Sequence, residues 1–531
     1  MVTLADLTAG ARLLWSLPWF LRSPVDPEHA RAVLRTRLQR RDADFLDLMR
    51  RTVFAGTSSP YRALLSHAGC EYGDLAAMVR RDGVEGALHA LYRRGVYLTA
   101  DEFKGRRPLV RGSLTLTVHP AQFANPLATV HVPTQSSGSR GERTAAGIDL
   151  AHLRDQAVGL RLFLDARGAR RWVHAHCGVP GGSAVHAMLR LACAGLPPHA
   201  WFSHVDPATP ELHPRYRWSV RVVRWGSWLG GQPFGSPQHV RPDDPRPILK
   251  WIAQVRRRGL VPHLRATPST AVLVCQAALD AGVDISGTEF TAGGEPLTTT
   301  RAAVGARAGA RIVPQYASVE SGHIAYGCLA PAAADDHHVL SDLQAIIQPG
   351  ERADGAGLPP EAILLTSLRA SAPFILLNVS SGDVARVEER ACGCPLEALG
   401  WRTHLQAIRG YEKLTAGGMT FLDTDLVRVL EEVLPARFGG GPTHYQLVEE
   451  EGPGGRPLLR LLVHPAVGPV DPGAVADAFL AAIGAGPGPA RVMELFWRGA
   501  DMLRVERAAP LLTATGKILH LHHDRRQRVN A

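Results

Sequence analysis

The chain has 531 residues, of which 45% are hydrophobic and 20% are charged, and this size and composition predict a globular protein with two or more domains. Its 59 lysines and arginines outnumber its 49 acidic residues, for a formal net charge of +10. That charge would suit a nucleic acid, an anionic membrane or an anionic small molecule. The basic residues are scattered and are not interleaved with aromatic ones, which argues against a nucleic-acid partner.

The seven cysteines have no disulfide-like spacing, so we expect a reducing compartment and a cytoplasmic protein. No secretory signal is expected, because the apolar stretch from Leu13 to Leu21 is too short to span a bilayer and no cleavage site follows it. Its tryptophans, Trp15 and Trp19, would suit peripheral contact with a membrane surface. Packing of this stretch against the rest of the protein is the favoured interpretation.

The N-terminal region is predicted to be helical up to about Tyr97. Asp26 is a candidate helix N-cap, and Ala30, Leu34 and Leu38 recur at the spacing of one helix face.

From residue 133 to about residue 376, short apolar runs alternate with stretches of helical spacing. The runs Leu127–Val132 and Val220–Val223 are predicted strands, and Pro247–Arg256 is a predicted helix. This alternation predicts a layered α/β fold with mostly parallel strands.

The segment Ser136-Ser137-Gly138-Ser139-Arg140-Gly141-Glu142 follows the first of these strands. Hydroxyl groups and backbone N–H groups in such a loop can converge on one point, as a polyphosphate requires. A flexible surface turn has the same composition. The motifs that come later in the chain favour the phosphate interpretation: Gly293-Gly294-Glu295-Pro296-Leu297, Tyr316-Ala317-Ser318-Val319-Glu320, Ser381-Gly382-Asp383 and Thr513-Ala514-Thr515-Gly516-Lys517.

This ordered set resembles the adenylate-forming (ANL) superfamily of acyl-CoA synthetases and adenylation domains, and within it the phenylacetate-CoA ligase branch. Arg140 and Glu142 depart from the phosphate loop of that branch, where a threonine and a lysine stand. The similarity extends from about Pro133 to Lys517. Five loop positions match the pattern: Ser136, Ser137, Gly138, Gly141 and Thr144.

The resemblance implies two domains. Residues 1–409 would form a large layered α/β adenylation domain that includes a helical leader region, 1–110. Residues 410–531 would form a small mobile α+β domain that carries Lys517. A hinge is expected at Glu412 or Lys413, with an ordinary turn as the alternative.

The resemblance also implies roles for single residues. Attack of a carboxylate on the α-phosphorus of ATP builds negative charge on phosphate oxygens, so the site needs fixed donors and cations. Lys517, Glu320 and Arg140 are the expected catalytic residues: Lys517 at the α-phosphate, Glu320 with Mg²⁺, and Arg140 at the β- and γ-phosphates. Tyr316 would lie against adenine, and Asp383 would accept both ribose hydroxyls.

For Tyr316 the alternative is a core residue, and for Glu320 a solvated surface charge. The expected nucleotide-binding residues are Ser136, Ser137, Gly138, Ser139, Gly141, Thr144, Gly294, Glu295, Pro296, Tyr316 and Asp383.

A second group of residues concerns a metal. Cys328, His338, Cys392 and Cys394 resemble the cysteines and histidine found at similar places in that branch. Three thiolates and one imidazole would make a closed, structural zinc site, and free buried cysteines are the alternative. His337 competes with His338 for the fourth position. The histidines His520, His522 and His523 resemble a metal-binding tract, but a disordered end is favoured.

Together these features indicate an enzyme that uses ATP to activate a carboxylic acid as an acyl-adenylate, releases pyrophosphate and transfers the acyl group to CoA. One alternative is an adenylating enzyme that transfers the acyl group to a carrier-protein thiol or to an amine, or that activates an unusual oxyacid. A relative that binds nucleotide without turnover is another. By resemblance, the acid is expected to be aromatic or of medium chain length. The stretch from His174 to His186 and the region before Gly293 are expected to line the pocket that binds it.

Overall fold

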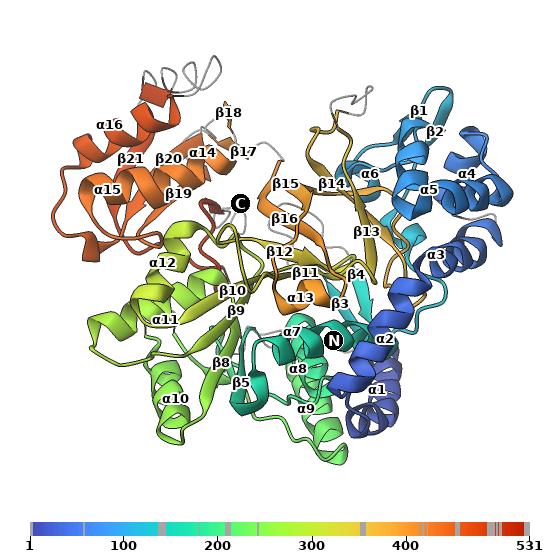
Figure 1. Ribbon diagram of the computed structural model, residues 1–531. Coiled ribbons are helices and arrows are strands. Elements are labelled where there is room, and N and C mark those ends of the chain that lie inside the picture. The colour runs from blue at the N-terminus through green and yellow to red at the C-terminus, as the bar shows by residue number, and fades with distance from the viewer. Residues whose placement is uncertain are drawn as a thin grey trace.

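The computed structural model describes residues 4–56, 59–135, 145–179, 181–207, 214–241, 244–350, 357–411, 414–416, 419–421, 423–451, 457–485, 494, 497–498, 502–513 and 515–524. Its N-terminal part is helical, as predicted, and lies at the right of Figure 1 in blue. The Asp26 carboxylate caps the second helix by accepting from the N–H groups of Glu28 and His29 at 3.0 and 2.9 Å. The elements of this part are α1 (Leu4–Arg22), α2 (Pro27–Gln39), α3 (Arg41–Met49), a π-turn (Arg50–Phe54), α4 (Pro60–His67), α5 (Tyr72–Arg93) and α6 (Ala100–Phe103).

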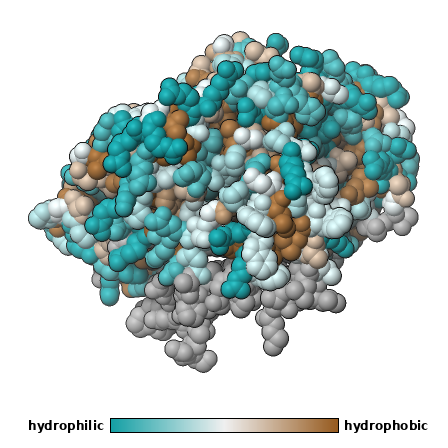
Figure 2. Space-filling view, turned by 90° about the horizontal axis from the view of Figure 1, so that it is seen from below, coloured by the Kyte–Doolittle hydropathy of each residue, from teal (hydrophilic) through white to brown (hydrophobic). Residues whose placement is uncertain are grey.

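Helix α1 packs against helix α9 (Pro214–Leu229), so the packing predicted for the stretch 13–21 is confirmed. Its tryptophans nevertheless face outward: Trp15 and Trp19 are 81% and 70% exposed. Trp225 and Trp228 on α9 are exposed as well. Figure 2 looks at the side of the molecule that holds these helices and shows brown apolar residues interrupting a teal surface. None of the described helices has the length and apolarity needed to cross a bilayer.

A twelve-stranded sheet runs through the centre of the molecule in the order β13-β14-β15-β16-β12-β11-β10-β9-β8-β5-β6-β7. The predicted layered α/β fold is confirmed, but only the half from β10 to β7 is parallel, while the rest is antiparallel. The parallel half comprises β5 (Trp172–Cys177), β6 (Ala200–Ser203), β7 (Gln238–His239), β8 (Val261–Ala266), β9 (Glu289–Gly293) and β10 (Arg311–Ser318). The antiparallel half comprises β11 (Gly322–Gly327), β12 (His337–Val339), β13 (Gln344–Ile347), β14 (Ala362–Ser367), β15 (Val379–Glu389) and β16 (Thr403–Gly410).

Helices cover the parallel half because its strands bury side chains on both faces. One hydrophobic cluster joins α7 and α8 to α1 and α2, and another packs α10, α11 and α12 over β8 and β9. The covering helices are α7 (Leu150–Ala166), α8 (Gly182–Cys193), α10 (Arg246–Arg257), α11 (Pro268–Asp280) and α12 (Thr299–Arg307), and a short α13 (Pro395–Ala398) follows later. The remaining short strands are β1 (Leu109–Arg111), β2 (Leu114–Leu116), β3 (Val132–Gln135), β4 (Ala145–Ile148), β17 (Leu414–Ala416) and β18 (Met419–Phe421).

Two strand predictions were wrong. The run Val220–Val223 lies inside α9, where Val222 and Val223 are buried, so packing of a helix face overrides the strand preference of β-branched residues. In the run Leu127–Val132 only the last residue is in a strand, which continues to Gln135 and contains Pro133. That proline is tolerated because β3 pairs only with β4 in a two-stranded hairpin.

The C-terminal unit, residues 423–524, has its own four-stranded sheet in the order β21-β20-β19-β22 and its own hydrophobic core. It lies at the upper left of Figure 1, above α11 and α12. The predicted disordered end was wrong for the histidines, since His520 is buried and His522 and His523 lie in β22 beside β19. The elements are α14 (Asp423–Arg428), a π-turn (Val429–Val433), α15 (Leu434–Phe438), β19 (Tyr445–Glu451), β20 (Pro457–Val463), α16 (Pro472–Ile483), β21 (Leu503–Arg507) and β22 (Leu521–Asp524).

Candidate functional site

The C-terminal unit places Lys517 directly over the end of strand β9. Gly294, the residue after that strand, has a positive φ of 86°. A Cβ atom at this position would lie 3.0 Å from the Lys517 Nζ atom. Glycine therefore provides both the left-handed backbone and the space that the ammonium group occupies.

A closed turn presents Lys517. Its backbone N–H donates to Thr513 Oγ1 at 3.0 Å, and its carbonyl accepts from the Thr513 N–H at 2.9 Å. The Gly516 carbonyl in this turn accepts from the hydroxyl groups of Thr267 and Thr270, at the start of α11, at 3.1 and 3.4 Å. Hydrogen bonds inside the turn thus hold its shape, and hydrogen bonds to the start of α11 fix its position.

Glu295 continues the contact between the two parts of the chain. Its carboxylate accepts from the N–H and the hydroxyl of Ser269, both at 2.9 Å. The Ser269 hydroxyl oxygen in turn accepts from the N–H of Ile518, the residue after Lys517, at 3.2 Å. Burial lowers the pKa of Lys517, and the negative charge of Glu295 opposes that shift.

A buried ion-pair network fastens the C-terminal unit beside this turn. Arg301 on α12 is fully buried, and its Nε atom donates to Glu431 Oε1 at 2.8 Å. The Glu431 carboxylate also accepts from the hydroxyl groups of Thr298 and Thr300 and lies 2.7 Å from His520 Nε2. The boundary between the two parts is therefore held by charge-assisted hydrogen bonds.

Glu431 is ionised because of these partners. Burial alone would raise the pKa of its carboxyl group, but the Arg301 charge and the hydrogen bonds from His520 and Thr298 outweigh that effect and lower the pKa to about 2. Since the pKa is depressed in the folded protein, the stabilisation is complete above the ordinary glutamate value of 4.5 and is lost as the pH falls toward 2.

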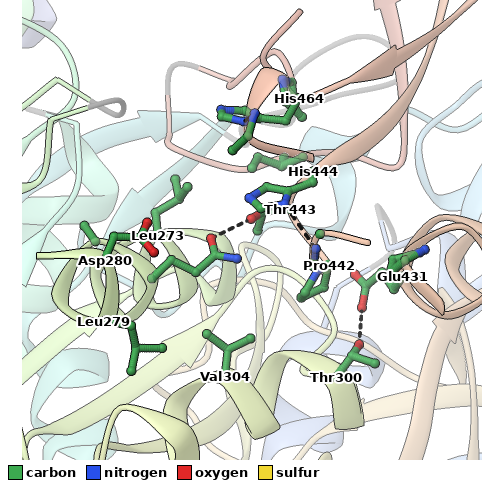
Figure 3. A pocket seen from close by; sticks show the side chains of 18 of the residues that line it. Leu273, Leu279, Asp280, Thr300, Val304, Glu431, Pro442, Thr443, His444 and His464 are labelled. Atoms are coloured by element: carbon green, nitrogen blue, oxygen red, sulfur yellow. Dashed lines mark hydrogen bonds between the residues drawn. The ribbon is translucent and has the colours of Figure 1, made fainter. Parts of the chain in front are cut away.

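A pocket of about 610 Å³ opens at the same boundary. Figure 3 shows Thr300 and Glu431 pointing toward each other at one end of it, with Thr443, His444 and His464 of the C-terminal unit above. The predicted residues Gly294, Tyr316 and Asp383 are not among the residues that line it. The pocket is thus separate from the place where Lys517 meets Gly294.

The structure brings Tyr316 and Asp383 together although they stand on strands β10 and β15. The tyrosine hydroxyl donates to Asp383 Oδ2 at 2.6 Å. Burial raises the pKa of Tyr316 well above its ordinary value, and the negative charges of Asp383 and Glu320 raise it further. Because Tyr316 is adjacent to Gln315, whose strand partner is Gly293, these residues belong to the same sheet edge as Gly294.

The predicted phosphate loop lies outside the described residues, in the connection between β3 and β4. The hinge residues Glu412 and Lys413 also lie outside the described part of the chain. Pro296 is described, and its carbonyl accepts from Arg301 Nη1 at 3.4 Å. The undescribed loop residues are Ser136, Ser137, Gly138, Ser139, Arg140, Gly141, Glu142 and Thr144.

The four predicted metal ligands converge at one point. One ligand atom from each of Cys328, His338, Cys392 and Cys394 lies within 4.8 Å of the others. His338 Nε2 is 3.1 Å from Cys394 Sγ and 3.6 Å from Cys392 Sγ.

The orientation of the His338 ring is fixed by a carbonyl group. His338 Nδ1 is 2.6 Å from the Trp401 carbonyl oxygen, which can only accept. The proton therefore belongs on Nδ1, and the lone pair of Nε2 faces the sulfur atoms. His337, by contrast, contacts the Asp335 carbonyl oxygen and is not part of the cluster.

Sequence reasoning missed the residues that fasten the two parts of the chain. Arg301 and Glu431 are 130 positions apart, and each stands in a helical stretch that holds another residue of the same charge, Arg307 and Glu432 respectively. No local pattern distinguishes them from the surface charges around them. Ser269 was also missed, because a lone serine at a helix start is usually a capping residue.

No protein-family model and no curated protein matches the sequence. Among solved structures, the chain is similar to 2-hydroxyisobutyryl-CoA ligase in the postadenylation state in complex with 2-HIB-AMP, with a TM-score of 0.53, 15% identity, and 95% of this chain and 92% of that chain covered. A structure of the same ligase with R3-HIB-AMP gives the same values. At this identity the likeness shows a shared fold.

We predict that Glu431→Gln loosens the contact between the C-terminal unit and α12, because Arg301 would lose its nearer carboxylate and keep only Glu295 at 3.6 Å. Hydrogen–deuterium exchange at neutral pH should become faster in residues 515–518. The matched control is Glu432→Gln at the adjacent exposed position, which should exchange like the unmodified protein. Equal exchange in both variants would contradict the role of the network.

Proposed function

From the premise that the chain has the fold of an adenylate-forming acyl-CoA ligase, we propose that it activates a carboxylic acid with ATP. The acid would displace pyrophosphate to give an acyl-adenylate, and the acyl group would then pass to the thiol of CoA. The position of Lys517 over Gly294 carries this proposal. Lys517 is a cation on the C-terminal unit, and it reaches the glycine turn at the end of strand β9. Such a cation suits a reaction in which negative charge develops on a phosphate.

The other residues at this edge suit a nucleotide. Asp383 has two carboxylate oxygens, of which Oδ2 accepts from Tyr316, and a carboxylate can serve the two hydroxyl groups of a ribose. Glu320 would supply a hard oxygen ligand to the Mg²⁺ that accompanies ATP. The ring of Tyr316 would offer adenine an apolar face.

Acid-dependent release of pyrophosphate tests the proposal. The protein is incubated with ATP, Mg²⁺ and a panel of carboxylic acids, with and without CoA, and products are followed by pyrophosphate assay and mass spectrometry. We expect acid-dependent pyrophosphate and a CoA thioester. Pyrophosphate without a thioester would move the acceptor to a carrier-protein thiol or an amine. ATP binding with no pyrophosphate for any acid would contradict the proposal and favour a nucleotide-binding protein without turnover.

We predict that Lys517→Ala lowers the rate of adenylation about 100-fold or more, because it removes a charge that acts on the first transition state. ATP binding and transfer from supplied acyl-adenylate should be largely retained. ATP–pyrophosphate exchange measures the first step, and Lys250→Ala, at an exposed position of α10, is the control. Unchanged exchange in Lys517→Ala would exclude this lysine from the chemistry.

We also propose that Cys328, His338, Cys392 and Cys394 hold a structural Zn²⁺. The donor set fits the ion, since three sulfur atoms and one neutral imidazole nitrogen face each other. When bound, the ion would join the loop after β11 to the loop between β15 and β16 and so hold the strand that carries Asp383. A closed shell of four protein ligands leaves no position for a substrate.

The zinc proposal predicts about one zinc per chain in protein purified without a metal-affinity tag, as four-ligand occupancy implies. Cys394→Ser should lower the thermal unfolding temperature and should have a smaller effect on the rate of pyrophosphate release. Cys275→Ser is the matched control, because that thiol is buried in α11 outside the cluster and should leave the zinc content unchanged. Well-folded, active protein without zinc would exclude the site.

A further inference from the structure

Arg190 on α8 is buried without a negatively charged partner. Its side chain has no exposed surface, and its Nη1 atom donates to the Tyr326 hydroxyl at 2.9 Å. Its Nε and Nη2 atoms have no hydrogen-bond partner among the described residues. A buried guanidinium with unsatisfied donors is strongly unfavourable unless something else pairs with it.

A second arginine faces the same region. Arg265 lies on β8, where its strand neighbour on β5 is His176. The side-chain amide of Gln315 is oriented so that both its oxygen and its nitrogen have hydrogen-bond partners. Its oxygen accepts from Arg265 Nε and Nη2 at 3.1 and 3.0 Å, and its nitrogen donates to His323 Nε2 at 3.3 Å. Arg265 is therefore held by a neutral amide. In the described part of the chain, neither Arg190 nor Arg265 forms an ion pair with a carboxylate.

Histidines complete the surroundings of the two arginines. Burial, followed by the charges of Arg190 and Arg265, lowers the pKa values of His176, His186 and His323 well below the ordinary value, so their rings are neutral. The rings of His186 and His323 are stacked, with centroids 6.1 Å apart. Both ring nitrogens of His176 lack a partner among the described residues. The region thus offers two cations and several hydrogen-bonding rings but no described counter-ion.

This cluster begins beside the turn that Lys517 covers. A Cβ atom on Gly293 would lie 2.7 Å from Gln315 Cγ, so the side chain that holds Arg265 packs against the residue before Gly294. Gln315 pairs with Gly293 and Arg265 pairs with Thr291 on strand β9, so both side chains belong to strands that flank the strand end covered by Lys517. The predicted acid-lining stretch from His174 to His186 contains His176 and ends one helical turn before Arg190.

We propose that Arg190 and Arg265 bind a second anionic group of the acid, so that the preferred substrate is a dicarboxylic acid or a carboxylic acid that carries another oxyanion, such as a sulfonate. This inference rests on the proposed adenylation. The planar guanidinium forks match the paired oxygen atoms of such a group. The bound anion supplies the counter-charge that the described residues lack, and N–H groups of the neutral histidines donate to its remaining oxygen atoms.

The test compares acids matched in carbon skeleton: butyrate with succinate, hexanoate with adipate, and 4-methylbenzoate with terephthalate, with 3-sulfopropionate as the sulfonate arm. Initial rates of pyrophosphate release give kcat/KM for each acid. We expect the dianionic member of at least one pair to be preferred about tenfold or more, since a site with buried unpaired donors rejects an analogue that lacks the matching group. The sulfonate arm distinguishes a site for any oxyanion from a site for a carboxylate alone.

Two variants locate the effect. Arg190→Met and Arg265→Gln should each lower kcat/KM for the preferred diacid about 30-fold or more, as expected when one member of a buried charge pair is removed, while the matched monoacid loses little. Arg161→Met is the control, because this partly buried arginine donates to the Ala194 carbonyl outside the cluster. It should leave the diacid preference unchanged.

The outcomes separate this inference from the proposed function. Equal or better activation of the monoacid in every pair by the unmodified protein would overturn the inference and leave adenylation intact, whether or not the variants fold. If no acid releases pyrophosphate, adenylation fails, and calorimetric titration with adipate and hexanoate decides the anion site. If the unmodified protein binds adipate and Arg265→Gln does not, the result would support the site. If the unmodified protein does not bind adipate, the result would overturn it.

Discussion

The arrangement of the two parts of this protein depends on one buried guanidinium. Arg301 must be paired wherever it is removed from water, because an uncompensated buried charge costs several kcal/mol, about 3–5 when a partner is lost. It lies between two carboxylates, with Glu431 of the C-terminal unit at 2.8 Å and Glu295 of its own side at 3.6 Å. The same Glu295 binds Ser269, which fixes the residue after Lys517. One network therefore sets both the docking of the unit and the position of its lysine.

This double pairing is suited to a unit that moves. If the C-terminal unit leaves, Arg301 loses Glu431 but keeps Glu295, so the guanidinium is not left without a counter-charge. Glu431 departs with His520, its own hydrogen-bond partner. Each side of the boundary thus carries part of the charge compensation with it.

The sequence predicted features that depend on contiguous residues, such as the helical N-terminal region, and missed pairing between distant residues. Gly294, Tyr316, Asp383 and Lys517 were named through the resemblance of their motifs to the adenylate-forming superfamily. The structure brings Lys517 to Gly294 and Tyr316 to Asp383, and the roles of these residues stay predictions. The four metal-ligand candidates were named from their resemblance to the phenylacetate-CoA ligase branch, and the structure brings their ligand atoms together. The helical N-terminal region followed from spacing alone.

The errors have a common physical origin. The run from Val220 to Val223 has strand-forming residues, yet it lies in a helix that packs against α1 and α8. Arg301, Arg190 and Arg265 are three arginines in a chain with 59 basic residues, and burial is decided by elements that meet only in the folded protein. His520 was assigned to a disordered end because nothing near it in sequence reveals that Glu431 lies opposite.

The burial of arginines also changes what the overall charge of the protein means. The formal charge of +10 counts Arg190 and Arg265, which face the interior and have no described acidic partner. A polyanion such as DNA or an anionic chromatography resin meets only the outer surface, so the protein should behave as less basic toward such partners than its composition states. The Arg190 charge, which has no exposed surface, is hidden from such a polymer.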